Sequence, residues 1–146
     1  MDVQVKQDGQ IRKGEIAETL LASIRNGYET GELIELEDRL DHYHPEGLYG
    51  RRQYLAKETV VVGKVHRRES ITILMKGTLA IVDENGNREL HHAPDVWITP
   101  VGRQRVICAV TDAEWIGVWP TELKELQDIE KDLTCMSMAE FESLEN

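Results

Sequence analysis

The sequence predicts a mainly β protein, a small barrel or sandwich with a helical segment before it and helices after it. Residues 46–119 contain roughly eight short runs rich in β-branched and aromatic residues, each ended by a turn signal. No helical pattern separates these runs, which excludes a parallel β-α-β sheet. Helical periodicity occurs instead at residues 14–40 and 121–144. We therefore expect residues 1–146 to form a single domain.

The N-terminal segment, residues 14–40, begins with a helical pattern. Apolar residues recur there at helical spacing: Ile16, Leu20, Leu21 and Ile24. Asn26-Gly27 is a typical signal for the end of that helix. Three further apolar residues stand among acidic ones: Leu33, Ile34 and Leu36. They fit either a short strand or another turn of helix.

Turn residues interrupt the central region at short intervals, as they do in antiparallel β proteins. The predicted strands are Leu48–Lys57, Thr59–Val65, Ile71–Met75, Thr78–Val82, Arg88–His91, Val96–Thr99, Gln104–Val110 and Trp115–Val118. Gly77 ends one of them, and the cluster Asp83-Glu84-Asn85-Gly86 predicts a hairpin turn, because Asn and Gly tolerate positive φ.

The C-terminal region, residues 121–144, returns to helical spacing. Thr121 is a candidate N-cap for a first helix. Its apolar stripe consists of Leu123, Leu126, Ile129 and Leu133. Ser137 and Glu140 form a capping-box pattern for a last short helix, with Phe141 and Leu144 as docking residues.

The composition limits the class of function. The chain has 17 basic and 27 acidic side chains, a net charge of −10, which argues against nonspecific binding of nucleic acid. No apolar run is long enough to span a membrane, and the N-terminus lacks the apolar core of a secretory signal. Cys108 and Cys135 fit reduced thiols, so we expect a cytoplasmic protein.

Two short segments resemble the motifs of the cupin superfamily. The first runs from Gly63-Lys64-Val65-His66 through Ser70 to Gly77, and the second is Pro100-Val101-Gly102 followed by Arg105. The resemblance implies a double-stranded β-helix, a jelly-roll barrel, over residues 48–119. Three stretches are similar to small cupin-like proteins of tailed phages and prophages: Gly47–Arg51, Gly63–His66 and Thr99–Gly102. This closer similarity implies a genomic setting but no reaction.

The same resemblance argues against a cupin metal centre. Metal-binding cupins usually offer two His and a Glu from the first motif and a His from the second. Here Lys64, His66, Ser70 and Arg105 stand at those positions. Glu69 has the opposite strand parity to Ser70, so it points to the other face. Because cations repel a metal ion, we expect no metal, no other cofactor and no catalysis.

The same residues suit an anion. Arg offers a planar fork and Lys a point charge to carboxylate or phosphate, so we predict that Lys64, His66 and Arg105 converge at the barrel mouth. The full predicted ligand-binding set is His44, Tyr49, Arg51, Lys64, His66, Ser70, Thr72, Trp97, Arg105 and Trp119. The alternative is that Arg105 and Lys64 pair with internal acids and plug the barrel.

Other motifs have both a functional and a structural interpretation. His42 and His44 have a spacing that binds Zn or Cu, for instance with His66, but we favour a loop that packs on the barrel mouth. His91 and His92 point to opposite strand faces and are predicted to be solvated.

Two further features are assigned structural roles. The basic pairs Arg51-Arg52 and Arg67-Arg68 are predicted to lie on solvated strand faces. Cys108 is predicted to be a small core residue.

The leading prediction is therefore a phage-encoded, non-catalytic accessory protein that binds a small anionic molecule or a phage or host protein. We expect a homodimer or higher homo-oligomer in the host cytosol. One alternative is a virion structural or assembly component that uses the barrel as an oligomerisation module. The other is a metal-dependent cupin enzyme of the isomerase or dioxygenase type.

Overall fold

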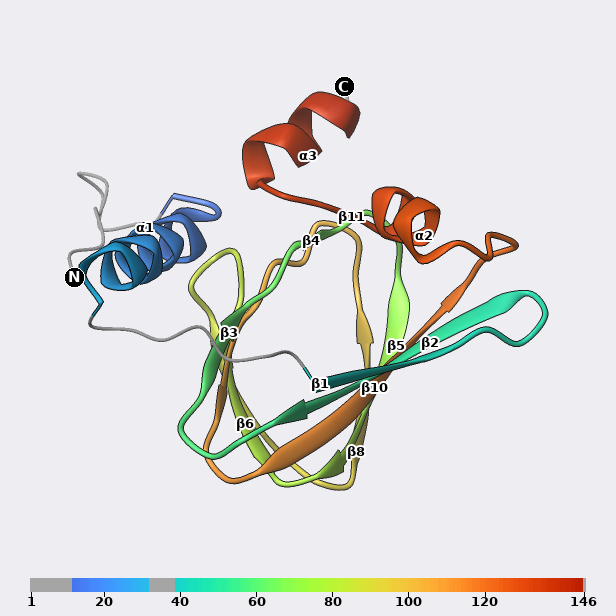
Figure 1. Cartoon of the computed structure of the whole chain (residues 1–146), viewed down its shortest axis with the longest axis horizontal. Coiled ribbons are helices and arrows are strands. Elements are labelled where there is room, and N and C mark those ends of the chain that lie inside the picture. The colour runs from blue at the N-terminus through green and yellow to red at the C-terminus, as the bar shows by residue number, and fades with distance from the viewer. Residues whose placement is uncertain (1–11, 32–38, 146) are drawn as a thin grey trace.

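A computed structural model of the chain describes residues 12–31 and 39–145. Two antiparallel sheets face each other and enclose a barrel, with one helix beside it and two at one end (Figure 1). This architecture confirms the predicted mainly β jelly roll with helices at both ends.

The larger sheet has five strands in the order β1-β2-β10-β5-β8. Their bounds are β1 Arg39–Tyr43, β2 Leu48–Leu55, β10 Ala113–Pro120, β5 Ser70–Lys76 and β8 Asp95–Thr99. The order is not sequential: β10, late in the chain, lies between β2 and β5. Long-range pairing of this kind closes a double-stranded β-helix.

The smaller sheet has four strands in the order β3-β9-β6-β7. Their bounds are β3 Val60–Val62, β9 Val106–Ala109, β6 Thr78–Val82 and β7 Arg88–His92. A two-stranded ladder joins β4 Val65–His66 to β11 Thr134–Cys135. All eight predicted strands are present, within a few residues of the expected ends.

Two predicted turns have the expected geometry. Gly77 has φ +85° between β5 and β6, and a Cβ atom there would lie 2.1 Å from the carbonyl oxygen of Asp112. Only glycine fits such a close approach. Gly86, φ 84°, lies in the β6–β7 hairpin, where the Asp83 carboxylate accepts hydrogen bonds from the backbone N–H groups of Asn85 and Asn87.

The N-terminal prediction needs two corrections. Helix α1 spans Glu15–Thr30, passes through Asn26-Gly27 without a break, and ends at Gly31, which has φ 81°. Gly27 is buried, so tertiary packing of the helix overrides the local stop signal. Residues 39–40, predicted as helical, begin strand β1, which pairs with β2. Leu33, Ile34 and Leu36 lie outside the described residues.

The C-terminal region forms two helices, α2 Leu126–Leu133 and α3 Met138–Glu145. Thr121 is not the cap of α2, since Glu125 occupies that position and Thr121 Oγ1 accepts a hydrogen bond from the N–H of Leu123. The capping interaction before α3 is present: the N–H of Glu140 donates to Ser137 Oγ at 3.1 Å. Strand β11, between the two helices, was not expected.

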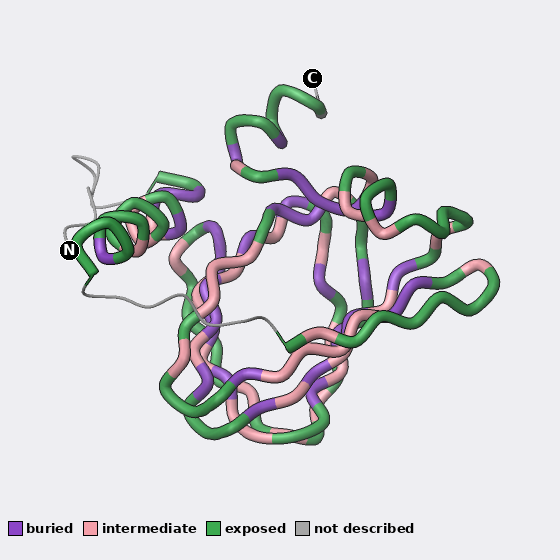
Figure 2. Tube along the Cα trace, viewed as in Figure 1, coloured by how far each residue is buried: buried purple, intermediate pink, exposed green. Residues whose placement is uncertain are grey.

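The barrel interior is divided along its length. One half is an apolar core contributed by both sheets: Leu55, Leu74, Leu79, Ile81, Ile107, Ala109, Ala113 and Trp115. At the other end, α2 places Ile129 and Leu133 against Tyr49 and Trp119. Figure 2 shows the buried positions alternating along the strands. Between the apolar core and α2 the barrel interior is polar. Among the described residues, no helix has the length and apolar character required to cross a membrane.

Candidate functional site in the polar half of the barrel

The strands β5 and β8 are polar on their inner face at the end nearest α2. Ser70, Thr72 and Thr99 are each at most 4% exposed. Thr72 lies opposite Trp97 in the β5–β8 register, and its hydroxyl forms a 2.7 Å hydrogen bond with the hydroxyl of Thr99. Leu74, on the same face of β5, belongs to the apolar core. The buried hydroxyls therefore show that the barrel interior changes from apolar to polar along this strand.

His66 is placed in this polar half by backbone hydrogen bonds. Its N–H donates to the carbonyl of Arg103 at 2.9 Å, and its own carbonyl accepts from the N–H of Gly102 at 2.8 Å. The imidazole is 5% exposed and stacks on the indole of Trp119, with ring centroids 5.9 Å apart. His66 and Trp119, both members of the predicted ligand-binding set, are therefore in contact.

Arginine side chains supply the positive charge around His66. Burial lowers the pKa of His66 to about 3, with further contributions from Arg105, Arg51 and Arg103. The imidazole is thus neutral at physiological pH. Burial also lowers the pKa of Arg105 to about 10, again with Arg51 and Arg103 contributing. Arg105 still remains charged, so a cation is held in a partly buried position.

The three arginines differ in how their charge is balanced. Arg103 pairs with Glu84 at 3.0 Å and with Asp83 at 3.8 Å. Arg51 lies 5.4 Å from the ring centroid of Trp119 and 4.0 Å from Glu130. Within the described part of the chain, Arg105 has no carboxylate within 4.0 Å, although the charge of Glu89 acts on it from farther away. The internal ion pair expected for Arg105 in the plugged-barrel interpretation is therefore not formed.

Four buried polar atoms of this region have no hydrogen-bond partner among the described residues. They are His66 Nδ1, Ser70 Oγ, Arg105 Nη1 and Trp119 Nε1. Such atoms are rare in native interiors, because each one costs about 1–3 kcal/mol when desolvated without a partner. Because these four atoms lie in one region of the barrel, they indicate a binding site for water or for a polar ligand.

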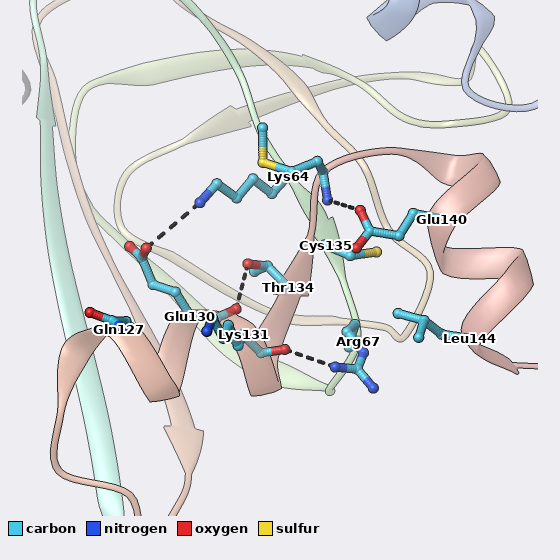
Figure 3. Close-up of a pocket in the computed structure, with 10 residues that line it drawn as sticks. Lys64, Arg67, Gln127, Glu130, Lys131, Thr134, Cys135, Glu140 and Leu144 are labelled. Carbon is cyan, nitrogen blue, oxygen red and sulfur yellow. Dashed lines mark hydrogen bonds and ion pairs between the residues drawn. The ribbon is translucent and has the colours of Figure 1, made fainter.

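Lys64 does not join this group. Its side chain is 45% exposed, and its ammonium nitrogen lies 3.7 Å from a carboxylate oxygen of Glu130 on α2. The predicted convergence of Lys64 with His66 and Arg105 is thus replaced by a cluster of His66 and three arginines. Lys64 instead lines a pocket of about 330 Å³ between β4, α2, β11 and α3 (Figure 3).

Hydrogen bonds join the walls of that outer pocket to one another. The Arg67 guanidinium donates to the carbonyl of Lys131 at 2.7 Å, and Glu140 accepts from the N–H of Met136 at 3.1 Å. Arg68 pairs with Asp132 at 3.1 Å. The Arg67-Arg68 pair therefore joins β4 to α2 and is not a free basic face.

A second polar cluster, missed at the sequence level, lies where the edge strands β7 and β8 approach each other. The imidazole of His91 is 15% exposed, with one ring nitrogen 2.8 Å from Asp95 and the other 2.8 Å from Glu89. It stacks on Trp97 at 3.9 Å between ring centroids, and the contact with His91 lowers the pKa of Asp95.

The prediction that both His91 and His92 are solvated is wrong for His91. A signal was available in the hairpin register. Leu79 and Ile81 face the core, and they lie opposite His91 and Glu89, so these two side chains must share the inner face.

His42 and His44 pack at the barrel mouth, as favoured. Both rings contact Tyr49, with centroids 5.9 Å and 5.4 Å away, and His42 Nδ1 is 2.7 Å from the Tyr49 hydroxyl. Both residues are otherwise exposed. Burial raises the pKa of Tyr49, so its hydroxyl stays protonated.

Two smaller predictions are corrected by strand parity. Arg51 faces the interior, whereas its neighbour Arg52 faces outward and pairs with Glu114. Cys108 is only partly buried, because its side chain lies on the face of β9 opposite that of Ile107, which belongs to the core.

The donor set does not fit the divalent metal that many cupins carry. His66 is surrounded by arginines rather than by further His or carboxylate ligands. Over the ranges 12–31 and 39–145, no three His, Cys, Asp or Glu side chains are grouped so as to hold a metal ion. Cationic neighbours disfavour a metal at this position.

Comparison with solved structures identifies the fold. The chain is similar to a cupin 2 conserved barrel domain protein from Salinispora arenicola, with TM-score 0.50, 20% identity and coverage of 70% of this chain and 89% of that one. An RmlC-like cupin with a double-stranded β-helix fold from Methanocaldococcus jannaschii gives TM-score 0.51 at 12% identity, covering 62% and 90%.

Salicylate 1,2-dioxygenase from Pseudoaminobacter salicylatoxidans gives TM-score 0.55 at 12% identity, with coverage of 82% of this chain but 34% of the dioxygenase. No family model and no curated protein matches the sequence. At these identities the comparisons establish architecture alone: the chain has the cupin fold, a double-stranded β-helix with added helices.

Proposed function

We propose that the protein binds a small carboxylate- or phosphate-bearing molecule in the polar half of its barrel, with Arg105 as the charged contact. One observation carries this proposal: an arginine without a paired carboxylate lies in the same buried region as three other unpartnered polar atoms. A buried charge left without a counterion is costly, and an anionic guest removes that cost.

Each lining group has a role in this proposal. Arg105 supplies a planar fork of N–H donors that matches carboxylate and phosphate oxygens. Trp119 Nε1 adds an N–H donor on a flat apolar surface, and Ser70 adds a hydroxyl. Because His66 is neutral, one ring nitrogen donates and the other accepts, which suits a ligand that also carries a hydroxyl or amide group.

We propose that this binding serves an accessory role without catalysis. The whole chain acts in that role as a single domain. The departure of Lys64, Ser70 and Arg105 from the metal-ligand pattern supports that role. The resemblance to small phage cupin-like proteins supports a phage-encoded protein in the host cytosol.

The test is thermal unfolding of the wild type and of Arg105→Ala, each with and without phosphate, nucleoside monophosphates and small di- and tricarboxylates. For the wild type, one class of anion should raise Tm in a saturable way, because a ligand that binds the native state stabilises it. Arg105→Ala should lose that shift while its own Tm stays the same or rises, since removal of an unpaired buried charge offsets the lost packing.

Lys64→Ala is the matched control, because it removes an exposed cation at the rim that already pairs with Glu130. It should retain the anion-dependent shift in Tm. If Arg105→Ala were destabilised by about 3–5 kcal/mol and no anion shifted the wild type, Arg105 would be a structural cation and the proposal would be wrong.

A further inference from the structure

The barrel interior has a second charged group, opposite in sign to the arginines. Glu89 and His91 lie on the inner face of β7, because they pair in register with Ile81 and Leu79 of the apolar core. Asp95 lies on the inner face of β8. Each ring nitrogen of His91 is 2.8 Å from one of the two carboxylates. We call Glu89, His91 and Asp95 the acidic cluster.

The acidic cluster keeps a net negative charge whether His91 is protonated or neutral, because two carboxylates face one imidazole. Among the described residues, no Lys or Arg side chain lies within 4.0 Å of Glu89 or Asp95. His91 contacts Oε2 of Glu89, and within the described part of the chain Oε1 has no hydrogen-bond donor. The Glu89 carboxylate therefore has an oxygen available to a cationic group.

Glu89 and Arg105 face the same interior. The β3–β9 ladder continues to Arg105, whose carbonyl accepts from the N–H of Gly63 at 2.9 Å, so Arg105 has the strand parity of Ile107. Ile107 lies in register with Ile81, and Ile81 with Glu89. Arg105 and Glu89 are thus on the inner face of one sheet, roughly 10 Å apart across β6. Burial lowers the pKa of Arg105, and the charge of Glu89 acts in the opposite direction.

The two charges are near each other but do not pair. The guanidinium of Arg105 and the carboxylate of Glu89 are more than 4.0 Å apart. The unpartnered hydroxyl of Ser70, a residue 4% exposed, lies in the same interior, and Ser70 is in register with Thr99 on the strand that carries Asp95. A plain anion on Arg105 would be repelled by Glu89, whereas a ligand with a positive charge at its other end would be attracted.

We propose that the ligand of the barrel is a small zwitterion, with a carboxylate or phosphate bound by Arg105 and an ammonium group bound by Glu89 of the acidic cluster. This inference rests on the proposed function, because it assumes that Arg105 binds an anion. The indole of Trp97, which stacks on His91, adds a ring that attracts cations. A zwitterion also adds no net charge to a chain that carries −10.

The experiment is isothermal titration calorimetry of the wild type with pairs of ligands that differ only in the ammonium group. The pairs are 4-aminobutyrate and butyrate, 6-aminohexanoate and hexanoate, and 2-aminoethyl phosphate and ethyl phosphate, at about pH 7, where the amines are protonated. In at least one pair the amino compound should bind roughly tenfold more tightly, because a charge-assisted hydrogen bond to Glu89 is gained. 4-Hydroxybutyrate, which has a donor without charge, should bind like butyrate.

Glu89→Gln tests the assigned residue. The substitution removes the charge but keeps the side-chain length and an oxygen that accepts from His91. It should abolish the preference for the amino compound and leave the affinity for the plain anion unchanged or higher. Glu58→Gln is the matched control, because it removes the same charge from an exposed position between β2 and β3. It should retain the preference.

The outcomes separate this inference from the proposed function. If neither amino nor plain anions bind, both are wrong. If the two members of every pair bind equally, the anion site stands and the zwitterion inference is wrong. A preference that persists in folded Glu89→Gln, as judged by far-UV circular dichroism, would show that the ammonium group is bound elsewhere. The wild-type series needs no variant, so it decides the matter even if Glu89→Gln does not fold.

Discussion

The two halves of the barrel interior are built from the same strands but differ in how fully their buried polar atoms are paired. On β5, Leu74 is completely buried among apolar side chains, whereas Ser70, four residues earlier on the same face, is buried with its hydroxyl unpartnered. On β10, Trp115 belongs to the apolar core, whereas Trp119 stacks on His66 with its N–H unpartnered. In the apolar half the side chains pack against one another. The polar half contains buried polar atoms that have no hydrogen-bond partner among the described residues.

This difference shows which half of the barrel interior supplies stability. Burial of apolar area stabilises the native state wherever side chains pack closely. Unpartnered polar atoms contribute no such stability and cost free energy when they are desolvated. A barrel closed at one end by an apolar core can therefore keep a costly polar region at the other end.

The largest expected effect tests the two halves directly. Leu74→Ala should lower the free energy of unfolding by about 2–5 kcal/mol, because it leaves a cavity in the apolar core. Ser70→Ala, on the same face of the same strand, should change it by no more than about 0.5 kcal/mol, since its hydroxyl has no partner to lose. Urea denaturation monitored by tryptophan fluorescence measures both.

Similar losses for Leu74→Ala and Ser70→Ala would contradict this difference between the two halves of the interior. They would mean that the Ser70 hydroxyl is bound to ordered water or to a group that matters for folding.

The second expected effect is a dependence of stability on pH that originates in the polar half. The folded pKa of His66 is about 3, whereas the unfolded chain takes up this proton near pH 6.5. Between these values the unfolded state binds more protons, so the free energy of unfolding falls as the pH drops. The loss due to His66 should be about 2 kcal/mol between about pH 7 and pH 5.

His66→Gln separates this contribution from that of the carboxylates, because Gln stays neutral over the whole range. The wild type should lose more stability than His66→Gln between these pH values. Parallel pH profiles for the two proteins would show that His66 is protonated with little cost, and hence that the polar half is open to solvent.

The smallest expected effect concerns metal. A chelator should change Tm by no more than about 1 °C, because a metal that does not bind the native state cannot stabilise it. Differential scanning calorimetry with EDTA, followed by addition of single divalent metals, measures this. A fall of many degrees that one metal restores would show that His66 ligates a metal despite its arginine neighbours.

Local patterns in the sequence predicted a sandwich or barrel, and the cupin resemblance specified the jelly roll. Runs of β-branched and aromatic residues located the eight central strands, and Gly77 and the Asp83–Gly86 cluster marked turns whose backbone requires positive φ. The prediction was wrong where distant contacts outweigh local preference. Asn26-Gly27 continues as helix because Gly27 is buried, and Arg39–Tyr43 forms a strand because β2 pairs with it.

The candidate site could be predicted only in part. The cupin resemblance pointed to His66, Ser70 and Arg105, and the structure buries Ser70 and Thr72 on one face of β5. Lys64 was misplaced because Glu130, 66 residues later in the chain, pairs with it. Glu89, His91 and Asp95 were missed because their cluster depends on two edge strands from different sheets.

The order of residues alone specifies which side chains share a strand face and where the chain can turn, because both depend on the alternation of Cβ directions and on the φ range of each residue. Which charges are paired and which are left alone depends on how folding brings distant segments together. Arg103 is balanced by Glu84, and Arg105 has no such carboxylate among the described residues. Pairing depends on distance and burial between segments far apart in the chain, and no local pattern specifies either.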